Sequence, residues 1–182
     1  MAALPDLITV AQFRELPERG DVSYELHHGE VVAVTRPRKG HVSLQMRIMR
    51  LLDARLQSFG EVVVECPYRP VVEFEFRVAD VAAVARERWD AVDPESDLYG
   101  APDLVVEVKS PSNTRTQLQE LVTLCLANGA VQCWIVDQSK QSVTVMHRDG
   151  SSAVYESGSQ IPLAAFGSGP LPVDEIFGAQ SF

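Results

Sequence analysis

Apolar and polar residues recur with two different periods along this chain, and together they predict a mixture of helices and strands. Apolar residues three and four positions apart predict helices at 9–17, 41–59 and 114–127. Segments rich in β-branched and aromatic residues predict strands at 22–27, 30–35, 61–66, 68–76, 79–84, 104–108, 131–136 and 142–147, with an edge strand at 154–155. Gly60 is expected to end the long helix, and 86–100 is expected to be a surface loop.

The order of these elements predicts an α/β fold, namely a mixed β-sheet flanked by helices. His28-Gly29 joins the first two strands into a β-hairpin that extends the N-terminal side of the core. The strand–helix–strand unit from 104 to 136 is expected to be a right-handed parallel crossover. We expect a single domain over 1–182 with its core at about 20–150, since 46% of the residues are hydrophobic.

The composition of the chain indicates which cellular compartment and which binding partners are to be expected. The three cysteines are odd in number and lie beside apolar residues, which favours reduced core thiols in a cytoplasm. No apolar run approaches the roughly 20 residues of a membrane span, so no membrane partner is expected. The net charge of −9 argues against a protein that coats nucleic acid with a broad basic surface. It leaves open an enzyme that meets phosphates through metal ions, because a bound cation inverts the local field.

Charged residues interrupt the ends of two apolar strands. Glu107 and Lys109 close the central strand 104–108, and Asp80 lies in the strand 79–84. Charges are rarely buried unless they are paired or bind a metal. Asp80 and Glu107 therefore predict a divalent-cation site, to which the carbonyl of Val108 is a further candidate ligand. Lys109 shares a strand face with Glu107 and is placed to activate a water molecule for hydrolysis.

These residues resemble the PD-(D/E)XK nuclease signature, and a longer ordered set over roughly residues 8 to 165 is similar to the Uma family of bacterial restriction-endonuclease-like proteins. The matching segments are Tyr24-Glu25-Leu26-His27-His28-Gly29-Glu30, His41, Glu107-Val108-Lys109-Ser110-Pro111-Ser112, Gly129 and Trp134-Ile135-Val136-Asp137. The resemblance implies a restriction-endonuclease-like core and an endonuclease that hydrolyses DNA with Mg²⁺, for which Mn²⁺ can substitute. It also implies a homodimer that cuts both strands through paired subunits.

The chain departs from the family pattern on the helix that follows the central strand. Gln117, Leu121 and Cys125 stand where the family usually has an aspartate, a lysine and a tyrosine. One interpretation is that Lys109 supplies the lysine from its alternative position on the strand. The other is that the chain is a catalytically inactive relative that serves as a protein- or nucleic-acid-binding module.

Glu25 and His41 are further candidates with open alternatives. Glu25 is a catalytic candidate that either assists metal binding through water, orients Lys109 or only fixes the hairpin. His41 opens the long helix, whose N-terminus should favour the neutral imidazole. It either contacts a phosphate, transfers protons, or is a capping or solvated residue.

Three alternatives concern charged surface residues. Asp80 has Arg77 as a possible ion-pair partner, and Glu107 with Lys109 is alternatively a plain salt bridge on an exposed edge. The loop residues Arg36, Arg38 and Lys39 form a compact basic cluster that either binds substrate phosphates or is simply solvated. Apolar C-terminal patches that include Phe177 and Phe182 are candidates for a two-fold contact.

Overall fold

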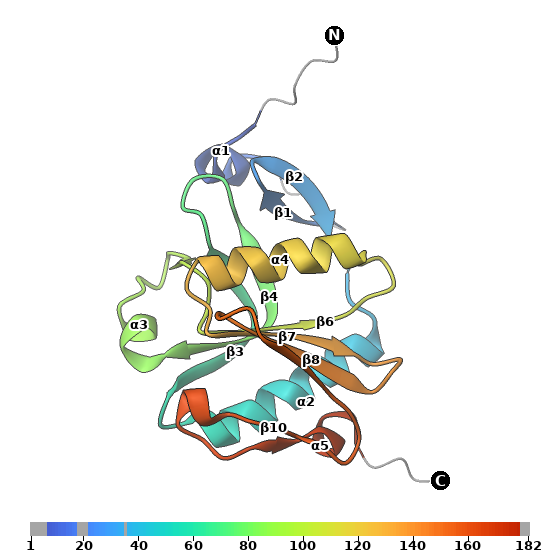
Figure 1. The fold of residues 1–182 in the computed structure, drawn as a ribbon. Helices are drawn as coiled ribbons and strands as arrows, with labels where there is room; N and C mark the ends of the chain where they lie inside the picture. Colours follow the sequence, from blue (N-terminus) through green and yellow to red (C-terminus); the bar gives the residue numbers. More distant parts are fainter. Residues whose placement is uncertain (1–6, 18–21, 35, 179–182) are drawn as a thin grey trace.

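A computed structural model describes residues 7–17, 22–34 and 36–178, and it contains a seven-stranded mixed sheet with helices on both faces (Figure 1). The strand order is β5-β3-β4-β6-β7-β8-β9, so β6 is the central strand, as predicted. It pairs antiparallel with β4 and parallel with β7. The strands are β3 Gly60–Arg69, β4 Arg77–Ala85, β5 Leu98–Tyr99, β6 Leu104–Val108, β7 Gln132–Asp137, β8 Ser142–His147 and β9 Ser152–Tyr155.

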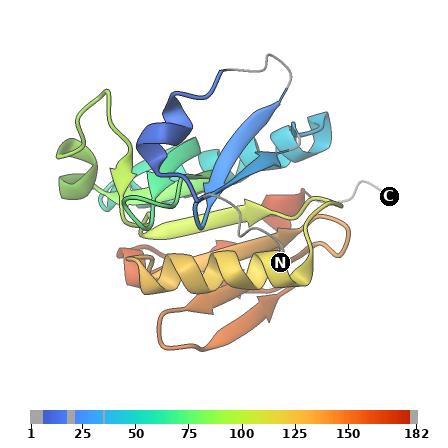
Figure 2. The same cartoon turned by 90° about the horizontal axis from the view of Figure 1, so that it is seen from above.

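The two long helices cover opposite faces of the sheet (Figures 1 and 2). Helix α2 (Lys39–Leu56) lies on one face together with the C-terminal elements, and α4 (Arg115–Ala127) lies on the other. The C-terminal elements are β10 Gln160–Ile161, η1 Ala164–Phe166, β11 Leu171–Pro172 and α5 Val173–Phe177. Since α4 connects the parallel strands β6 and β7, the predicted parallel crossover is confirmed.

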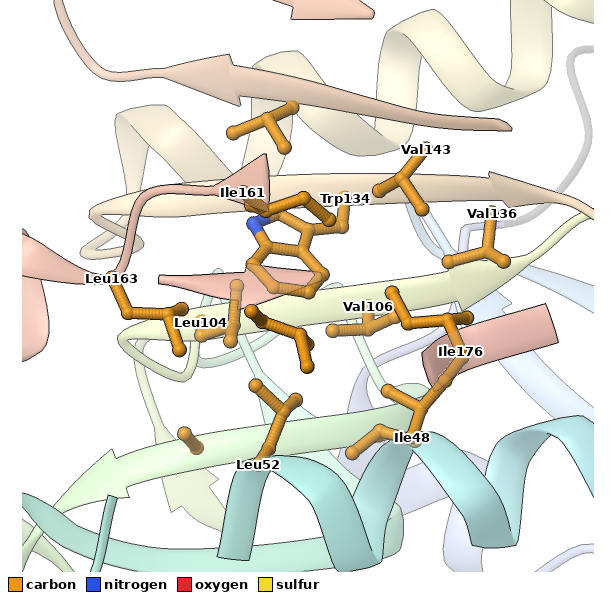
Figure 3. Packing of buried hydrophobic residues seen from close by; sticks show 14 of the residues in the cluster. Ile48, Leu52, Leu104, Val106, Trp134, Val136, Val143, Ile161, Leu163 and Ile176 are labelled. Carbon is orange, nitrogen blue, oxygen red and sulfur yellow. The ribbon is translucent and has the colours of Figure 1, made fainter. Parts of the chain in front are cut away.

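The larger part of the core fills the space between α2 and the sheet (Figure 3). Ile48 and Leu52 of α2 pack with Leu104 of β6 and Trp134 of β7, and all four are fully buried. A second cluster lies between the sheet and α4, and it includes the three cysteines, which are free and buried as predicted. Burying these apolar surfaces on both faces is the main source of the stability of the sheet.

The N-terminal hairpin of β1 (Ser23–His27) and β2 (Glu30–Val34) forms a small sheet of its own. It is joined to the chain just before β4, where Leu26 and Phe76 exchange two backbone hydrogen bonds of 2.9 Å. The buried carboxylate of Glu75 reinforces this junction, because it accepts from the backbone N–H of His28 at 2.8 Å and from Nε of Arg77 at 2.8 Å. The short helix α1 (Val10–Arg14) is shorter than the helix predicted at 9–17, and the side chain of Thr9 caps its N-terminus.

Three local expectations are wrong. Helix α2 ends at Leu56, and Gly60 instead begins β3, where an added Cβ would lie 1.9 Å from the carbonyl oxygen of Val84 on the neighbouring strand. A single strand, β3, runs through Pro67 to Arg69, and residues 70–76 form turns and loop rather than a strand. The expected loop 86–100 contains helix α3 (Arg86–Asp90) and strand β5.

The C-terminal patch is not a free apolar surface at Phe177, because this ring packs against the core. Phe182 lies outside the described residues. Within the described part of the chain, no helix has the length and apolar character needed to cross a membrane.

Replacing Leu52 with alanine tests whether the contact between α2 and the sheet stabilises the fold. We expect the free energy of unfolding to fall by about 2–5 kcal/mol, because the truncation leaves a cavity in a close-packed core. Urea denaturation measures this loss. Val42→Ala on the same helix is the matched control, since Val42 is 40% exposed and its truncation should cost less than about 1 kcal/mol. Equal losses in the two variants would contradict the assignment of α2 to the core.

Candidate active site

The candidate site lies where β4 and β6 diverge. The two strands pair through three residues each, 81–83 with 104–106. The backbone pairing of the two strands ends at Val81. Beyond it, the N–H of Val108 on β6 donates to Oδ2 of the Asp80 side chain at 2.7 Å and not to the backbone of β4. Asp80 thus occupies the register position opposite Glu107, and the antiparallel pairing brings these two predicted metal ligands side by side.

His41 holds the other oxygen of the same carboxylate. Its Nε2 lies 2.8 Å from Oδ1 of Asp80, and both side chains are 16% exposed. The hydrogen bond to Asp80 raises the pKa of His41, while partial burial opposes the shift and the charges of Asp80 and Glu65 add to it. The expectation that the helix N-terminus keeps His41 neutral is therefore wrong, because a partner carboxylate outweighs the helix dipole. The interpretation of His41 as a capping or solvated residue is wrong as well.

Gln45 is a site residue that the sequence analysis missed. Its side-chain Nε2 donates to the main-chain oxygen of Asp80 at 2.7 Å and also to Oε1 of Glu65. Glu65 has a left-handed backbone, with φ +50°, in the part of β3 that lies beside Asp80. The sequence carried a signal for Gln45: it is four residues after His41, on the otherwise apolar face of the helix, and buried polar groups need partners.

Glu107 is a buried carboxylate that feels the charges of two other carboxylates. Burial raises its pKa well above the ordinary value, and the negative charges of Asp80 and Glu25 raise it further, while the guanidinium of Arg77 opposes the shift. Glu25 comes from the hairpin, where Nε2 of His27 lies 2.6 Å from its Oε2. The fold thus brings Asp80 and Glu25, from two other segments of the chain, close enough to Glu107 to raise its pKa, and these three carboxylates are called the acidic group below.

Lys109 lies at the end of the central strand and makes a different contact from the one expected. Its Nζ donates to Oδ2 of Asp137 at 3.0 Å, and no contact among the described residues joins it to Asp80 or Glu107. A hydrogen bond from Ser139, followed by those from Lys109 and the backbone of Lys140, lowers the pKa of Asp137 to about 2. Asp137 therefore remains ionised and fixes the ammonium group beside the end of β6.

Two of the alternative pairings are wrong. Arg77 pairs with Glu75, with Nε and Oε2 2.8 Å apart, and not with Asp80. Glu107 and Lys109 do not form a salt bridge on an exposed edge, because β6 is central in the sheet and Lys109 pairs with Asp137. The side chain of Val108 points into the core, which leaves only its main chain available to the site.

The first turn of α2 places further predicted residues beside the site. Arg38 is the N-cap and Lys39 the first residue of this helix, and both are exposed two or three positions before His41. On the other side of the sheet, Leu121 and Cys125 of α4 pack into the second apolar cluster, and Sγ of Cys125 lies 3.2 Å from the hydroxyl of Tyr68. Gln117 completes a capping box with Thr114. The α4 positions at which the family resemblance implies polar residues therefore serve packing and capping here.

The donor set fits a hard divalent cation. Carboxylate and carbonyl oxygens are the ligands of Mg²⁺, which commonly takes one or two carboxylates and keeps several water molecules. Among the described residues, no three side chains of histidine, cysteine, aspartate or glutamate form a ready metal-binding group. Asp80 and Glu107 are thus two carboxylates that a Mg²⁺ ion with water ligands would suit, and a cation would offset the repulsion that raises the pKa of Glu107.

We call the place where β4 and β6 diverge, with Asp80 and Glu107 opposite each other, the acidic fork. The mixed sheet, its two covering helices and this fork define a protein of the restriction-endonuclease-like α/β class. The fold matches the crystal structure of a "putative nuclease belonging to DUF820" from Anabaena variabilis ATCC 29413, with a TM-score of 0.79 and 21% sequence identity over 93% of this chain and 97% of that chain. The sequence model of the Uma2 family, described as "Putative restriction endonuclease", matches residues 10–171. The chain therefore belongs to the Uma2 family, and no curated protein matches it.

Changing Glu107 to glutamine tests the electrostatic cost of the acidic group. An acid whose pKa is higher in the folded than in the unfolded protein destabilises the fold once the pH exceeds the pKa of the unfolded state, which is 4.5 for glutamate. Without divalent cations at pH 8, Glu107→Gln should therefore be at least as stable as the wild type in urea denaturation. Adding Mn²⁺ should raise the melting temperature of the wild type and leave that of the variant unchanged. A clear loss of stability without cations would contradict the described environment of Glu107.

Asp137→Asn tests the anchoring of Lys109. The lowered pKa means that the ionised carboxylate stabilises the fold above pH 3.8, and that this contribution disappears as the pH falls through about 2. We expect a loss of about 1 kcal/mol in the free energy of unfolding at pH 7, because solvent screens an ion pair whose lysine is 39% exposed. The difference from the wild type should shrink below pH 3.8. Asp53→Asn, which changes an exposed carboxylate on α2, is the control and should have little effect at any pH. A loss that persists unchanged at low pH would contradict the assigned contacts.

Proposed function

We propose that this protein is a Mg²⁺-dependent endonuclease that hydrolyses phosphodiester bonds of DNA. The observation that supports the proposal most strongly is the placement of Asp80 and Glu107 side by side at the fork between β4 and β6. Membership of the Uma2 family supports the nuclease class. The net charge of −9 is compatible with this activity because a cation at the acidic group reverses the local field that a phosphate meets.

In this proposal Asp80 and Glu107 would hold Mg²⁺, with the carbonyl of Val108 as a further ligand and Mn²⁺ as a substitute ion. When bound, the ion would supply Lewis-acid chemistry, which stabilises charge on the phosphate and lowers the pKa of a water molecule. His41 and the N–H of Val108 orient the Asp80 carboxylate through one oxygen each. This fixed geometry spares the site the cost of ordering Asp80 when substrate binds.

Lys109 and Glu25 complete the proposed catalytic group. Lys109 lies two residues beyond Glu107, and its ammonium group is a hydrogen-bond donor that can orient the attacking water or stabilise charge on the phosphate. For this role Lys109 would have to leave Asp137 and turn toward the substrate, and its flexible side chain, which is 39% exposed, allows such a rotation. Glu25 assists by accepting a hydrogen bond from water at the acidic group.

The assembly and location of the enzyme are part of the proposal. We expect a homodimer in which two sites cut the two strands of a duplex, acting in the cytoplasm as a single domain over 1–182. The free, buried state of all three cysteines is compatible with a reducing compartment.

A second candidate function is a non-catalytic binding module on the same fold. The observations that favour it are the apolar positions Leu121 and Cys125 on α4 and the ion pair that holds Lys109 on Asp137. Metal binding separates the two functions, since a binding module has no need for a cation at Asp80 and Glu107.

Calorimetry and plasmid nicking test the proposed nuclease. Titration with Mn²⁺ should release or absorb heat with the wild type but not with Asp80→Ala, and nicking with Mg²⁺ should fall by about 100-fold or more in Asp80→Ala and Lys109→Ala. Lys140→Ala is the matched control for the lysine, because Lys140 is exposed in the turn after β7, and it should nick like the wild type. Equal nicking by the wild type and Lys109→Ala would contradict the role of Lys109. The absence of heat in both proteins would favour the binding module.

A further inference from the structure

Positive charge is concentrated on one helix of an acidic protein. Residues 36–55, which contain all but the last residue of α2, carry six basic residues and one acidic residue, a local net charge of +5 in a chain of net charge −9. The basic residues are Arg36, Arg38, Lys39, Arg47, Arg50 and Arg55. The rest of the chain therefore carries a net charge of −14, and a polyanion would be repelled from most of the surface but attracted to this helix.

The fold turns most of these charges outward. Leu44, Ile48 and Leu52 face the core, which leaves Lys39, Arg47 and Arg50 exposed on the opposite side of the helix. Val42, Ser43, Met46 and Leu51 line a surface hollow together with Arg47 and Arg50. The outer face of α2 is thus a basic surface with an apolar floor.

Several of these charges have no counter-charge among the residues that the structure describes. Arg55 pairs with Glu175 at 2.8 Å, and Arg47 donates to the carbonyl of Ile176 at 3.4 Å. Arg38, Lys39 and Arg50 make no ion pair with any described residue. An exposed cation without a partner is free to neutralise a phosphate and release the counterions bound there.

We propose that the outer face of α2, defined by Arg38, Lys39, Arg47 and Arg50, binds the phosphate backbone of duplex DNA. The inference builds on the proposed nuclease function because it assigns that substrate a docking surface. Lys39 and Arg50 are eleven residues apart, which corresponds to about 16 Å along a helix, a length that spans several phosphates of a duplex. The N-terminal end of the same helix carries His41, which contacts Asp80. A backbone that follows α2 toward its N-terminus is therefore led to the acidic fork.

The side chains on this surface are suited to bind the phosphate backbone of a nucleic acid and not to recognise its base sequence. Arginine and lysine on an exposed helix neutralise phosphates, and these contacts position a duplex without selecting a sequence. The N-terminal end of the 18-residue helix adds a partial positive charge at the end nearest the site. The affinity should accordingly be strongly dependent on salt and weakly dependent on sequence.

Charge reversal on two helices tests the surface. The experiment measures binding of a fluorescent DNA duplex of about 20 base pairs by anisotropy, in EDTA, so that cleavage plays no part. Lys39→Glu/Arg50→Glu should weaken binding by at least about tenfold and reduce the dependence of log K on log salt by about two, one for each lost phosphate contact. Arg115→Glu combined with Gln119→Glu and Thr123→Glu lowers the net charge by the same four units at exposed residues of α4, and it should change affinity by less than about threefold.

Two other outcomes of the binding experiment would contradict the proposed docking surface. Unchanged binding by the α2 variant, or equal weakening by both variants, would overturn the proposed surface. Circular dichroism melting of both variants excludes misfolding as the cause of lost binding, and Lys39→Gln/Arg50→Gln, which is milder, should give an intermediate loss. If DNA binding depends on α2 but Mg²⁺ and Mn²⁺ support no nicking, the docking surface stands and the proposed nuclease function fails.

Discussion

The hydrogen bond from the N–H of Val108 to the Asp80 carboxylate is the constraint on which the site depends. A central strand must satisfy its backbone groups, and where β4 and β6 diverge the Asp80 side chain does so in place of a neighbouring strand. This contact keeps the fork open and at the same time fixes the direction of the carboxylate. His41 and Gln45 fix the same residue from α2, so the acidic site is coupled to the packing of the longest helix.

Glu107 differs from Asp80 because its ionised form is unfavourable in the folded protein. Asp80 has donors on both oxygens, whereas burial and two neighbouring carboxylates raise the pKa of Glu107. The fold maintains this unfavourable arrangement because other contacts determine it, among them the buried Glu75, which joins the hairpin to Arg77 and so places Glu25 near the fork. Groups whose pKa is shifted by burial and like charge are typical of functional sites, where stability is exchanged for chemistry.

Local sequence signals predicted most of the fold, and long-range partners account for what they missed. Strand β6, strand β8 and helix α4 follow from local residue patterns alone. Gly60 was misassigned because its close approach to Val84 depends on a strand 24 residues away. The partner of His41 is Asp80, which lies on the sheet and far away in the sequence. The helix position alone therefore predicted a neutral imidazole, whereas the contact with Asp80 raises the pKa of His41. Asp80 and Glu107 were correctly predicted to lie together because strand ends that interrupt an apolar run converge at one edge of a sheet.

The apolar face of α4 decides which residues are left to act on a substrate. With Leu121 and Cys125 packed in the second cluster and the hydroxyl of Tyr68 3.2 Å from Sγ of Cys125, neither of these α4 positions supplies a lysine or a tyrosine to the site. The only lysine beside Glu107 along the strand is then Lys109, and Asp137 holds its ammonium group. An ammonium group donates hydrogen bonds and has no lone pair with which to take a proton. Lys109 therefore orients water or stabilises charge in the proposed reaction, and the proton of the attacking water passes to a carboxylate of the site or to solvent.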